Sequence, residues 1–292
     1  MLKLVIPKGS LEAQTFALFE AADIRLRRAN DREYHGQVDD PRIERFSLMR
    51  PQEIPGYVQE GFFDFGLTGL DWVEETGAKV EVVAELPYTK GYVGGFVKIV
   101  LAVAESSIAG SAADLPAGTR ISTEYPNLTR RLFDELSIPV RIFVSYGATE
   151  AKVPEIVDAI VDVTETGSTL KRHGMRIIHT LLESPALLIA NPASYNDPEK
   201  RQALEDIRLL LMGAVDAHGK VLVKMNVSEQ DLESVSSVLP SLKAPTISKL
   251  AEEGFFAIET VVKKNEINLL IPTLKQRGAS DILELPITKI VD

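Results

Sequence analysis

Residues 50–77 read RPQEIPGYVQEGFFDFGLTGLDWVEETG and pass from helix to strand and back to helix. The helical spacing around Glu53–Glu60 ends at Gly61, and the apolar run at 63–67 that follows is typical of a short strand. A glycine-punctuated turn then leads into a second helix, and VEVVAELP at 80–87 is a further strand. Strands and helices that alternate in this way predict an α/β fold.

The same alternation extends to both sides of this stretch. LKLVIP at 2–7, FVKIVLAVAE at 96–105 and IVDV at 160–163 have the composition of buried strands, and helical patterns lie between them. Gly213 marks a boundary, and from about Lys220 the order changes to strand, helix, strand, strand, helix, strand. This βαββαβ order predicts a ferredoxin-like domain at the end of the chain.

Composition and charge exclude several classes of protein. The 292 residues are 45% hydrophobic and 25% charged, which is typical of a globular protein with two or three domains. The net charge of −10 repels nucleic acid phosphates. No apolar run reaches the roughly 18–20 residues that cross a bilayer, and the lack of cysteine excludes disulfides and thiolate metal sites. We therefore expect a cytoplasmic protein with no nucleic acid or membrane partner.

The segment 158–169, DAIVDVTETGST, carries the most informative polar residues. A buried strand is flanked by Asp158 and interrupted by Asp162, and small hydroxylated residues with Gly167 follow it at the entry to a helix. Backbone N–H groups and hydroxyls converge on a phosphate at such a turn, and carboxylates beside it suit ribose hydroxyls or a phosphate-bound Mg²⁺. From these residues alone, a simple capped helix with solvated aspartates is the favoured interpretation.

Other candidate anion contacts are scattered along the chain. Residues 7–10, PKGS, follow the first strand and could bind an anion, or form an ordinary turn with Ser10 as the helix N-cap. Arg50 and the pair Arg130 and Arg131 are candidate phosphate clamps, although a lone arginine is often only solvated. The histidines lack metal-ligand spacing, which argues against zinc. They are His35, His173, His179 and His218.

Five blocks of sequence together resemble the ATP phosphoribosyltransferase family, which catalyses the first step of histidine biosynthesis. They are IPKGSL at 6–11, RPQEIPGYVQEGFFDFGLTGLDWV at 50–73, TRISTEYPNLTRRLFDEL at 119–136, YGATEAKVPEIVDAIVDVTETGSTLKRHGM at 146–175, and GASDILELPITKIVD at 278–292. The blocks follow the family's order over nearly the whole chain. The last block and the βαββαβ tail resemble the long form, which carries its own regulatory domain and needs no separate regulatory subunit.

The resemblance implies a two-domain catalytic core like that of type II periplasmic binding proteins, with a ferredoxin-like regulatory domain after it. The implied domains are residues 1–93 with 178–210, residues 94–177 with the phosphoribosyl diphosphate loop, and residues 211–292. The implied reaction is attack of adenine N1 of ATP on C1 of 5-phosphoribosyl diphosphate, with release of pyrophosphate. Similar enzymes need Mg²⁺, are inhibited by histidine at the third domain, and form dimers and hexamers.

The resemblance also implies roles for particular residues. Asp158 and Asp162 would face the ribose and its metal, with Asp158 as a metal contact. The residues that would wrap the 5-phosphate are Glu165, Thr166, Gly167, Ser168 and Thr169. The implied catalytic residues are Lys8, Arg50 and Glu150, of which Glu150 would accept from the 6-amino group, and the implied ATP contacts are Gly9, Tyr125 and Arg130. The histidine pocket would comprise Asn226, Thr246, Ser248 and Ala279.

Two stretches depart from the family pattern. The family usually writes PKGRL, and Ser10 replaces that arginine here. A fork-shaped donor to phosphate is lost, so the contact must come from Lys8 or another cation, or ATP binds more weakly. Residues 88–98 also differ, and no site residue is assigned there.

Two other protein classes share the expected core. A prephenate dehydratase joins a similar core to a small amino-acid-sensing domain, but its Thr-Arg-Phe motif is absent here. A ligand-sensing binding protein on the same fold would be expected to carry a secretion signal or a DNA-binding appendage, and we identify neither in the sequence. Because fold alone does not separate these classes, the site has to decide.

Overall fold

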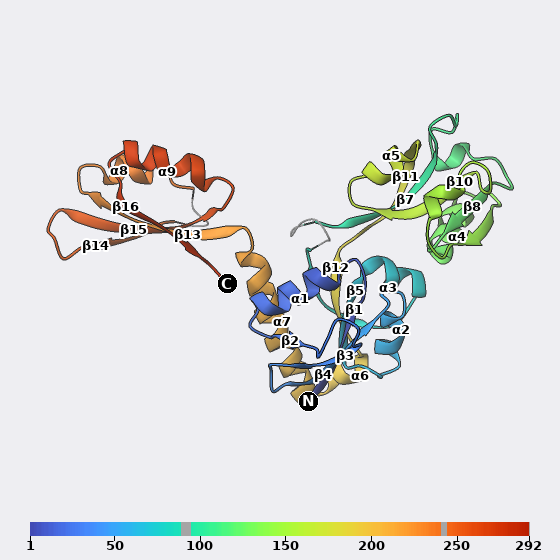
Figure 1. Cartoon of the computed structure of the whole chain (residues 1–292), viewed down its shortest axis with the longest axis horizontal. Coiled ribbons are helices and arrows are strands. Elements are labelled where there is room, and N and C mark those ends of the chain that lie inside the picture. The colour runs from blue at the N-terminus through green and yellow to red at the C-terminus, as the bar shows by residue number, and fades with distance from the viewer. Residues whose placement is uncertain (89–94, 241–243, 292) are drawn as a thin grey trace. The chain divides into compact units, whose positions relative to one another are not determined.

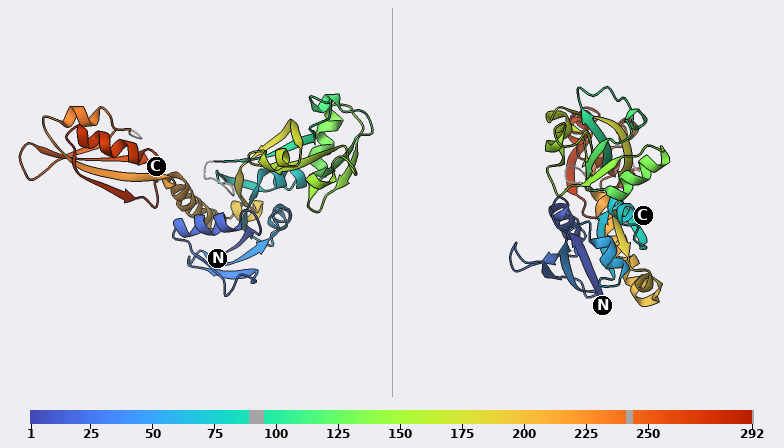
Figure 2. Two further views of the ribbon diagram at one scale, coloured as in Figure 1. Left: turned by 45° about the horizontal axis from the view of Figure 1, so that its top comes forward. Right: turned by 90° about the vertical axis from the view of Figure 1, so that its right-hand side faces the viewer.

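The computed structural model describes residues 1–88, 95–240 and 244–291 (Figures 1 and 2). The chain divides into two compact units, Met1–Arg208 and Leu209–Asp292, which we call unit 1 and unit 2. The division falls inside helix α7 (Pro198–Ala217). No helix in the described ranges is long and apolar enough to span a bilayer.

The first part of unit 1, which we call the first lobe, is built on a seven-stranded sheet with the order β2-β3-β4-β1-β5-β12-β6. The strands are β1 (Leu2–Pro7), β2 (Leu26–Arg27), β3 (His35–Val38), β4 (Ile43–Met49), β5 (Phe65–Gly69), β6 (Glu81–Leu86) and β12 (Ala186–Ala190). Strand β1 is parallel to β4 and β5 and almost wholly buried, as expected for a central strand covered on both faces. The helices of this lobe are α1 (Glu12–Ala21), α2 (Ile54–Gln59), α3 (Leu70–Thr76) and α6 (Pro192–Asn196).

The rest of unit 1, the second lobe, is built on a five-stranded sheet with the order β11-β7-β10-β8-β9. The strands are β7 (Val97–Ala104), β8 (Arg120–Thr123), β9 (Arg141–Val144), β10 (Ala159–Thr164) and β11 (Met175–Ser184). Strand β8 is parallel to β9 and β10, so all three carboxyl ends lie at one edge of the sheet. The helices are η1 (Ala112–Asp114), α4 (Pro126–Glu135), η2 (Thr149–Lys152) and α5 (Ser168–Arg172).

The connections between the lobes differ in part from the sequence prediction. Residues 178–184, which the predicted boundaries assign to the first lobe, continue β11 and pair with β7 in the second sheet. The apolar run IIHTLLES stays extended up to Pro185, and β12 then returns the chain to the first sheet. The other predicted crossover, between residues 93 and 94, lies outside the described residues.

Unit 2 is an antiparallel sheet with two helices, as the sequence pattern predicts. Its strands and helices are β13 (Lys220–Ser228), α8 (Leu232–Ser236), β14 (Thr246–Lys249), β15 (Phe255–Lys263), α9 (Ile267–Gln276) and β16 (Ser280–Pro286). The sheet order β14-β15-β13-β16 is the ferredoxin-like order, and Figure 1 shows α8 and α9 on one face of the sheet. Alternate residues of β13, such as Val223 and Met225, form the core with those helices.

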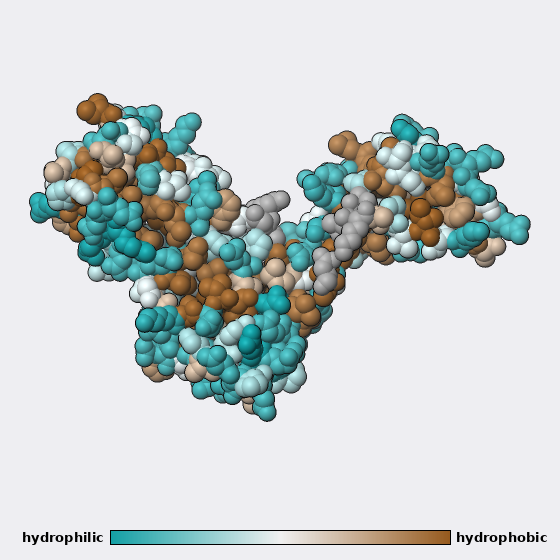
Figure 3. Space-filling model, turned by 180° about the vertical axis from the view of Figure 1, so that it is seen from behind, coloured by the Kyte–Doolittle hydropathy of each residue, from teal (hydrophilic) through white to brown (hydrophobic). Residues whose placement is uncertain are grey.

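The predicted fold class is therefore confirmed. Unit 1 carries the two α/β lobes of a binding-protein-like core, and unit 2 is the βαββαβ domain. The face drawn in Figure 3 is largely hydrophilic, with hydrophobic side chains gathered in patches.

Candidate active site

A loop with a glycine and several hydroxyl side chains stands at the carboxyl end of β10. The strand ends at Thr164, and Gly167 adopts a φ of +74°, a left-handed conformation that glycine adopts at little cost. Its N–H donates to Thr164 Oγ1 at 2.8 Å, and the Thr166 hydroxyl donates to Ser168 Oγ at 3.0 Å. The turn places Thr166, Ser168 and Thr169 in the lining of a cavity of about 290 Å³, which we call the loop cavity. Its lining includes Glu150, Asp162, Glu165, Thr166, Ser168 and Thr169.

Carboxylates make the loop cavity acidic. Burial raises the pKa of Asp162 to about 6, and the charges of Glu150 and Glu124 add to this rise. The backbone N–H of Val163, at 2.7 Å from Asp162 Oδ1, and the ammonium group of Lys152 act in the opposite direction. The loop cavity therefore favours a ligand that brings positive charge near Asp162.

Two cations stand at the carboxyl edge of the first sheet. Pro7 of β1 pairs in register with Met49 of β4, so Lys8 and Arg50 are the next residues of two neighbouring parallel strands. Ligands bind at this edge in open α/β sheets. The Lys8 ammonium lies 3.8 Å from the centre of the Tyr34 ring.

These cations line a second cavity, of about 320 Å³, which we call the central cavity. Its wall in the first lobe includes Lys8, Gly9, Ser10 and Arg50, and its wall in the second lobe includes Glu124, Tyr125, Val163, Thr164 and Glu165. Residues 163–165 also line the loop cavity, so the two cavities share a wall. Ser10, the residue that departs from the family pattern, therefore lines the central cavity.

Tyr125 lines the central cavity, but its hydroxyl is already engaged. The phenol donates to Asp71 Oδ2 at 2.8 Å, and the ring stacks on Trp72 with centroids 4.5 Å apart. Burial raises the pKa of Tyr125 well above its usual value, and the Asp71 carboxylate raises it further. The Tyr125 hydroxyl therefore joins the second lobe to the first through Asp71.

Two predicted site residues lie away from both cavities. Asp158 is at the amino end of β10, six residues and roughly 20 Å of strand before Thr164. It pairs with Arg120 at 2.6 Å, and that guanidinium lowers the pKa of the carboxyl. Arg130, on α4, has Nη1 3.1 Å from Asn127 Oδ1 and lines a separate shallow pocket. The structure brings neither residue to the loop.

Replacing Asp158 by asparagine should accordingly leave both substrate constants unchanged. The pair with Arg120 is close to half exposed, so its loss should lower the free energy of unfolding by less than about 1 kcal/mol. Initial-rate kinetics and denaturant unfolding of Asp158→Asn test this. A tenfold rise in the KM for either substrate would contradict the placement.

Several residues that line the central cavity were not predicted from the sequence. Asp71, Trp72, Gln52 and Glu124 all line the central cavity. Glu124 directly precedes Tyr125, so its position next to a predicted contact was the available signal. The buried carboxylate of Asp71 follows Leu70 in the apolar run after Gly69, where nothing local distinguishes it from a solvated helix residue.

The four predicted histidine-pocket residues of unit 2 divide between two environments. Asn226, Ala257 and Ser248 pair in one row across β13, β15 and β14, on the sheet face away from α8 and α9. Thr246 is two residues before Ser248 and shares that face, and Asn226 Nδ2 donates to Asp281 Oδ2 at 2.9 Å. Ala279 instead lies in the core with the helices.

Unit 1 is a two-lobed α/β core in which a loop with glycine and hydroxyl side chains and two basic residues line adjoining cavities. Two cavities that share a wall are the arrangement expected of an enzyme that joins two small molecules. Residues 50–212 match the family model described as ATP phosphoribosyltransferase, and residues 217–289 match the model described as HisG, C-terminal domain. The chain belongs to the ATP phosphoribosyltransferase family, and it is therefore an enzyme of histidine biosynthesis.

Named relatives agree over their full lengths. The ATP phosphoribosyltransferase of Pelotomaculum thermopropionicum is 45% identical, with 99% of each chain covered. That of Solibacter usitatus is 46% identical, over 100% of this chain and 99% of its own. A solved ATP phosphoribosyl transferase (HisG:HisZ) complex from Thermotoga maritima is 26% identical with a TM-score of 0.61, over 73% of this chain and 99% of the other. Prephenate dehydratase and a ligand-sensing protein are set aside.

Proposed function

We propose that unit 1 joins 5-phosphoribosyl diphosphate to N1 of ATP and releases pyrophosphate. The observation that carries this proposal is the wall at residues 163–165 that the two cavities share. The phosphoribosyl group would occupy the loop cavity, with its 5-phosphate on residues 165–169 and its ribose toward Asp162. ATP would occupy the central cavity against Lys8, Gly9 and Arg50, so that the reacting atoms meet at the shared wall.

The residues would act mainly by position and charge. The adenine N1 lone pair forms the new bond to C1, and the electron pair of the broken C1–O bond leaves with the diphosphate. Lys8 and Arg50 would neutralise phosphate charge that shifts during transfer. Glu150, which lines the loop cavity, would accept from the 6-amino group as N1 becomes positively charged. We leave Asp158 and Arg130 out of the proposed site because they lie away from both cavities.

The acidic loop cavity suits Mg²⁺ that is also bound to the diphosphate of the substrate. Among the described residues no group of three His, Asp or Glu side chains is placed to hold a metal. Asp162 and Glu150 nevertheless offer oxygen atoms of the kind that Mg²⁺ prefers, and Mg²⁺ commonly binds through one or two carboxylates plus substrate phosphates. When bound, the ion would neutralise the leaving diphosphate.

We further propose that unit 2 is a regulatory domain that binds histidine. Asn226, Thr246 and Ser248 offer polar groups on one sheet face, which suits a small amino acid. In the HisG:HisZ complex of Thermotoga maritima, the matched chain is covered almost completely by 73% of this chain. The additional part of this chain would replace a separate regulatory subunit. The expected assembly is a homo-oligomer, dimeric or hexameric, in the cytoplasm.

Histidine should slow turnover by the full chain. Purified protein is mixed with ATP, 5-phosphoribosyl diphosphate and Mg²⁺, and pyrophosphate release is followed with and without histidine. Ser248→Trp should weaken inhibition at least about tenfold without changing uninhibited kcat, because the bulky ring fills the proposed pocket on exposed β14. Turnover that histidine leaves unchanged would contradict the regulatory proposal alone.

A further inference from the structure

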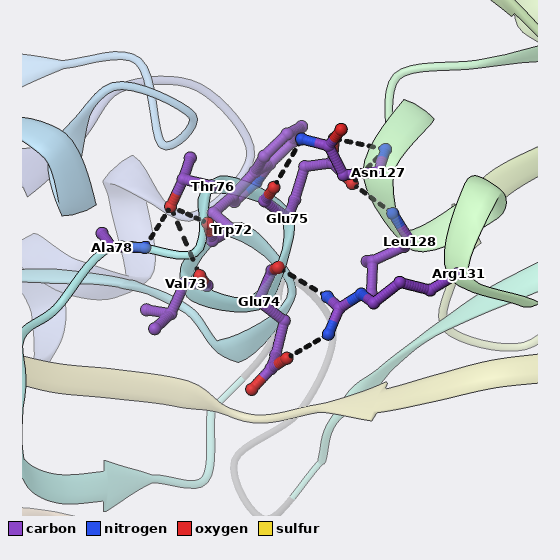
Figure 4. A network of polar contacts seen from close by, with 9 residues as sticks. All are labelled: Trp72, Val73, Glu74, Glu75, Thr76, Ala78, Asn127, Leu128 and Arg131. Atoms are coloured by element: carbon purple, nitrogen blue, oxygen red, sulfur yellow. Dashed lines mark hydrogen bonds and ion pairs between the residues drawn. The ribbon is translucent and has the colours of Figure 1, made fainter.

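Helix α3 of the first lobe caps helix α4 of the second lobe (Figure 4). The Glu75 carboxylate accepts hydrogen bonds from the backbone N–H of Asn127 at 2.9 Å and of Leu128 at 2.8 Å. In return, Asn127 Nδ2 donates to the Glu75 backbone oxygen at 2.9 Å. Tyr125, the N-cap residue, provides no side-chain cap, and Pro126 has no N–H. The carboxylate from the other lobe therefore satisfies the free amides of α4.

A second contact joins the same helices one turn earlier on α3. Asp71 accepts hydrogen bonds from the hydroxyls of Tyr125 at 2.8 Å and of Ser184 at 2.6 Å. Ser184 ends β11, where the chain leaves the second sheet. Asp71 and Glu75 are only 3% and 6% exposed, so both contacts are shielded from water. They are far stronger candidates for holding the lobes than the exposed pair of Glu74 and Arg131.

Burying two carboxylates between the lobes costs more free energy than apolar contacts would. Burial raises the pKa of both Asp71 and Glu75, which shows that the surroundings oppose their charge. Well-packed apolar residues usually hold two surfaces together at least as stably as buried charges do. Directional hydrogen bonds instead fix one orientation of the joined parts. Here that orientation determines where residues 124 and 125, the turn before α4, stand in the wall of the central cavity.

We propose that Glu75 is a positioning residue for the transfer reaction, acting as a latch that fixes the second lobe against the first. This inference rests on the proposed function, in which each substrate is bound mainly by one lobe. Loosening the latch would then leave the separate affinities nearly unchanged, but it would misalign N1 with C1. A displacement of about 1 Å at reacting atoms can lower the rate by about 100-fold.

Two variants separate the latch from simple helix capping. Glu75→Ala should lower kcat at least tenfold while the KM for each substrate changes less than threefold, and Glu75→Gln should recover part of the loss because its amide oxygen still accepts. Asn127→Asp is nearly isosteric, and an acidic residue in the first turn favours α4. It cannot donate to the Glu75 oxygen and it repels the carboxylate, so the same fall in kcat is expected. Glu81→Gln, at an exposed position of β6, is the matched control and should behave like the wild type.

The orientation of the two lobes relative to each other can also be measured without catalysis. Because the chain has no cysteine, Glu60→Cys and Glu135→Cys place one spin label on an exposed residue of each lobe. The distance distribution between the labels should be narrow in the otherwise native chain and should broaden with Glu75→Ala and with Asn127→Asp.

Three results would overturn the latch. They are an unchanged kcat in both folded variants, a rise in KM at constant kcat, which would make Glu75 a substrate contact, or a defect in Glu75→Ala that Asn127→Asp does not share. If the wild type itself shows no turnover, the proposed function fails. The distances between the labels would then still test whether Glu75 holds the lobes together, because an unchanged distance distribution in both variants contradicts the latch.

Discussion

Gly167→Val should raise the KM for 5-phosphoribosyl diphosphate by about 100-fold while the KM for ATP changes little. The φ of +74° at Gly167 excludes a β-branched residue, so the backbone must move and displace Thr166, Ser168 and Thr169, which line the loop cavity and would contact the phosphate. Loss of two hydrogen bonds to a charged group costs about 3 kcal/mol or more, which corresponds to at least about 100-fold in affinity. Initial rates with each substrate varied in turn provide the measurement.

Gly174 supplies a matched control for this change. It has a similar φ of +65° and open space around it, but it lies at the other end of α5. Gly174→Val carries a comparable backbone cost without touching the loop, so it should lower stability and leave both KM values near those of the wild type. Equal effects of the two variants on substrate binding, or a loss of ATP affinity alone in Gly167→Val, would show that the loop does not bind the phosphoribosyl group.

Asp162→Asn should make the protein more stable and nearly inactive. Burial raises the pKa of Asp162 from 3.8 to about 6, so the folded chain binds this proton more tightly than the unfolded chain does. The stability of the free protein therefore falls as the pH rises from about 4 to about 6 and stays lower above it. Removing the charge should raise the free energy of unfolding at pH 7.5 by as much as about 3 kcal/mol.

The activity of this variant should change in the opposite direction. An ionised Asp162 facing the ribose and the metal-bound diphosphate would contribute two charged contacts, so kcat/KM should fall at least about 100-fold. In the wild type, kcat/KM should decline below about pH 6 as Asp162 binds a proton, and the variant should lack this decline. Denaturant unfolding and rate profiles across pH 5–8 measure both effects. A variant that is both active and no more stable would contradict this account of the loop cavity.

Much of the fold could be predicted from local patterns. The alternation in residues 50–87 and the βαββαβ tail are properties of neighbouring residues, and the observed elements follow them closely. The end of β11 was predicted less well. Apolar residues 177–182 suit either sheet, and only the pairing with β7 assigns them to the second. Pairing partners distant in sequence are not visible in a local pattern.

The same distinction between local patterns and distant partners applies to the site residues. The loop at 164–169 could be recognised because its glycine and hydroxyls are contiguous, and Lys8 because it follows a predicted strand, whereas Arg50 was only one of several candidate phosphate clamps. Asp158 was predicted from the family resemblance and from its proximity in sequence, but it stands at the amino end of β10, away from the loop, because an extended strand carries neighbours far apart. The roles of Asp71 and Glu75 depend on partners 52–113 residues away, which no spacing rule supplies.

The product of the reaction tests the central claim most directly. The purified full chain is incubated with ATP, 5-phosphoribosyl diphosphate and Mg²⁺, and the nucleotide product is isolated and its point of attachment determined by mass spectrometry and NMR. The account predicts one product with the phosphoribosyl group on adenine N1, formed in equal amount with pyrophosphate and nearly absent with Gly167→Val. A folded protein that binds both substrates but yields no such product, or attaches the group elsewhere on ATP, would contradict it.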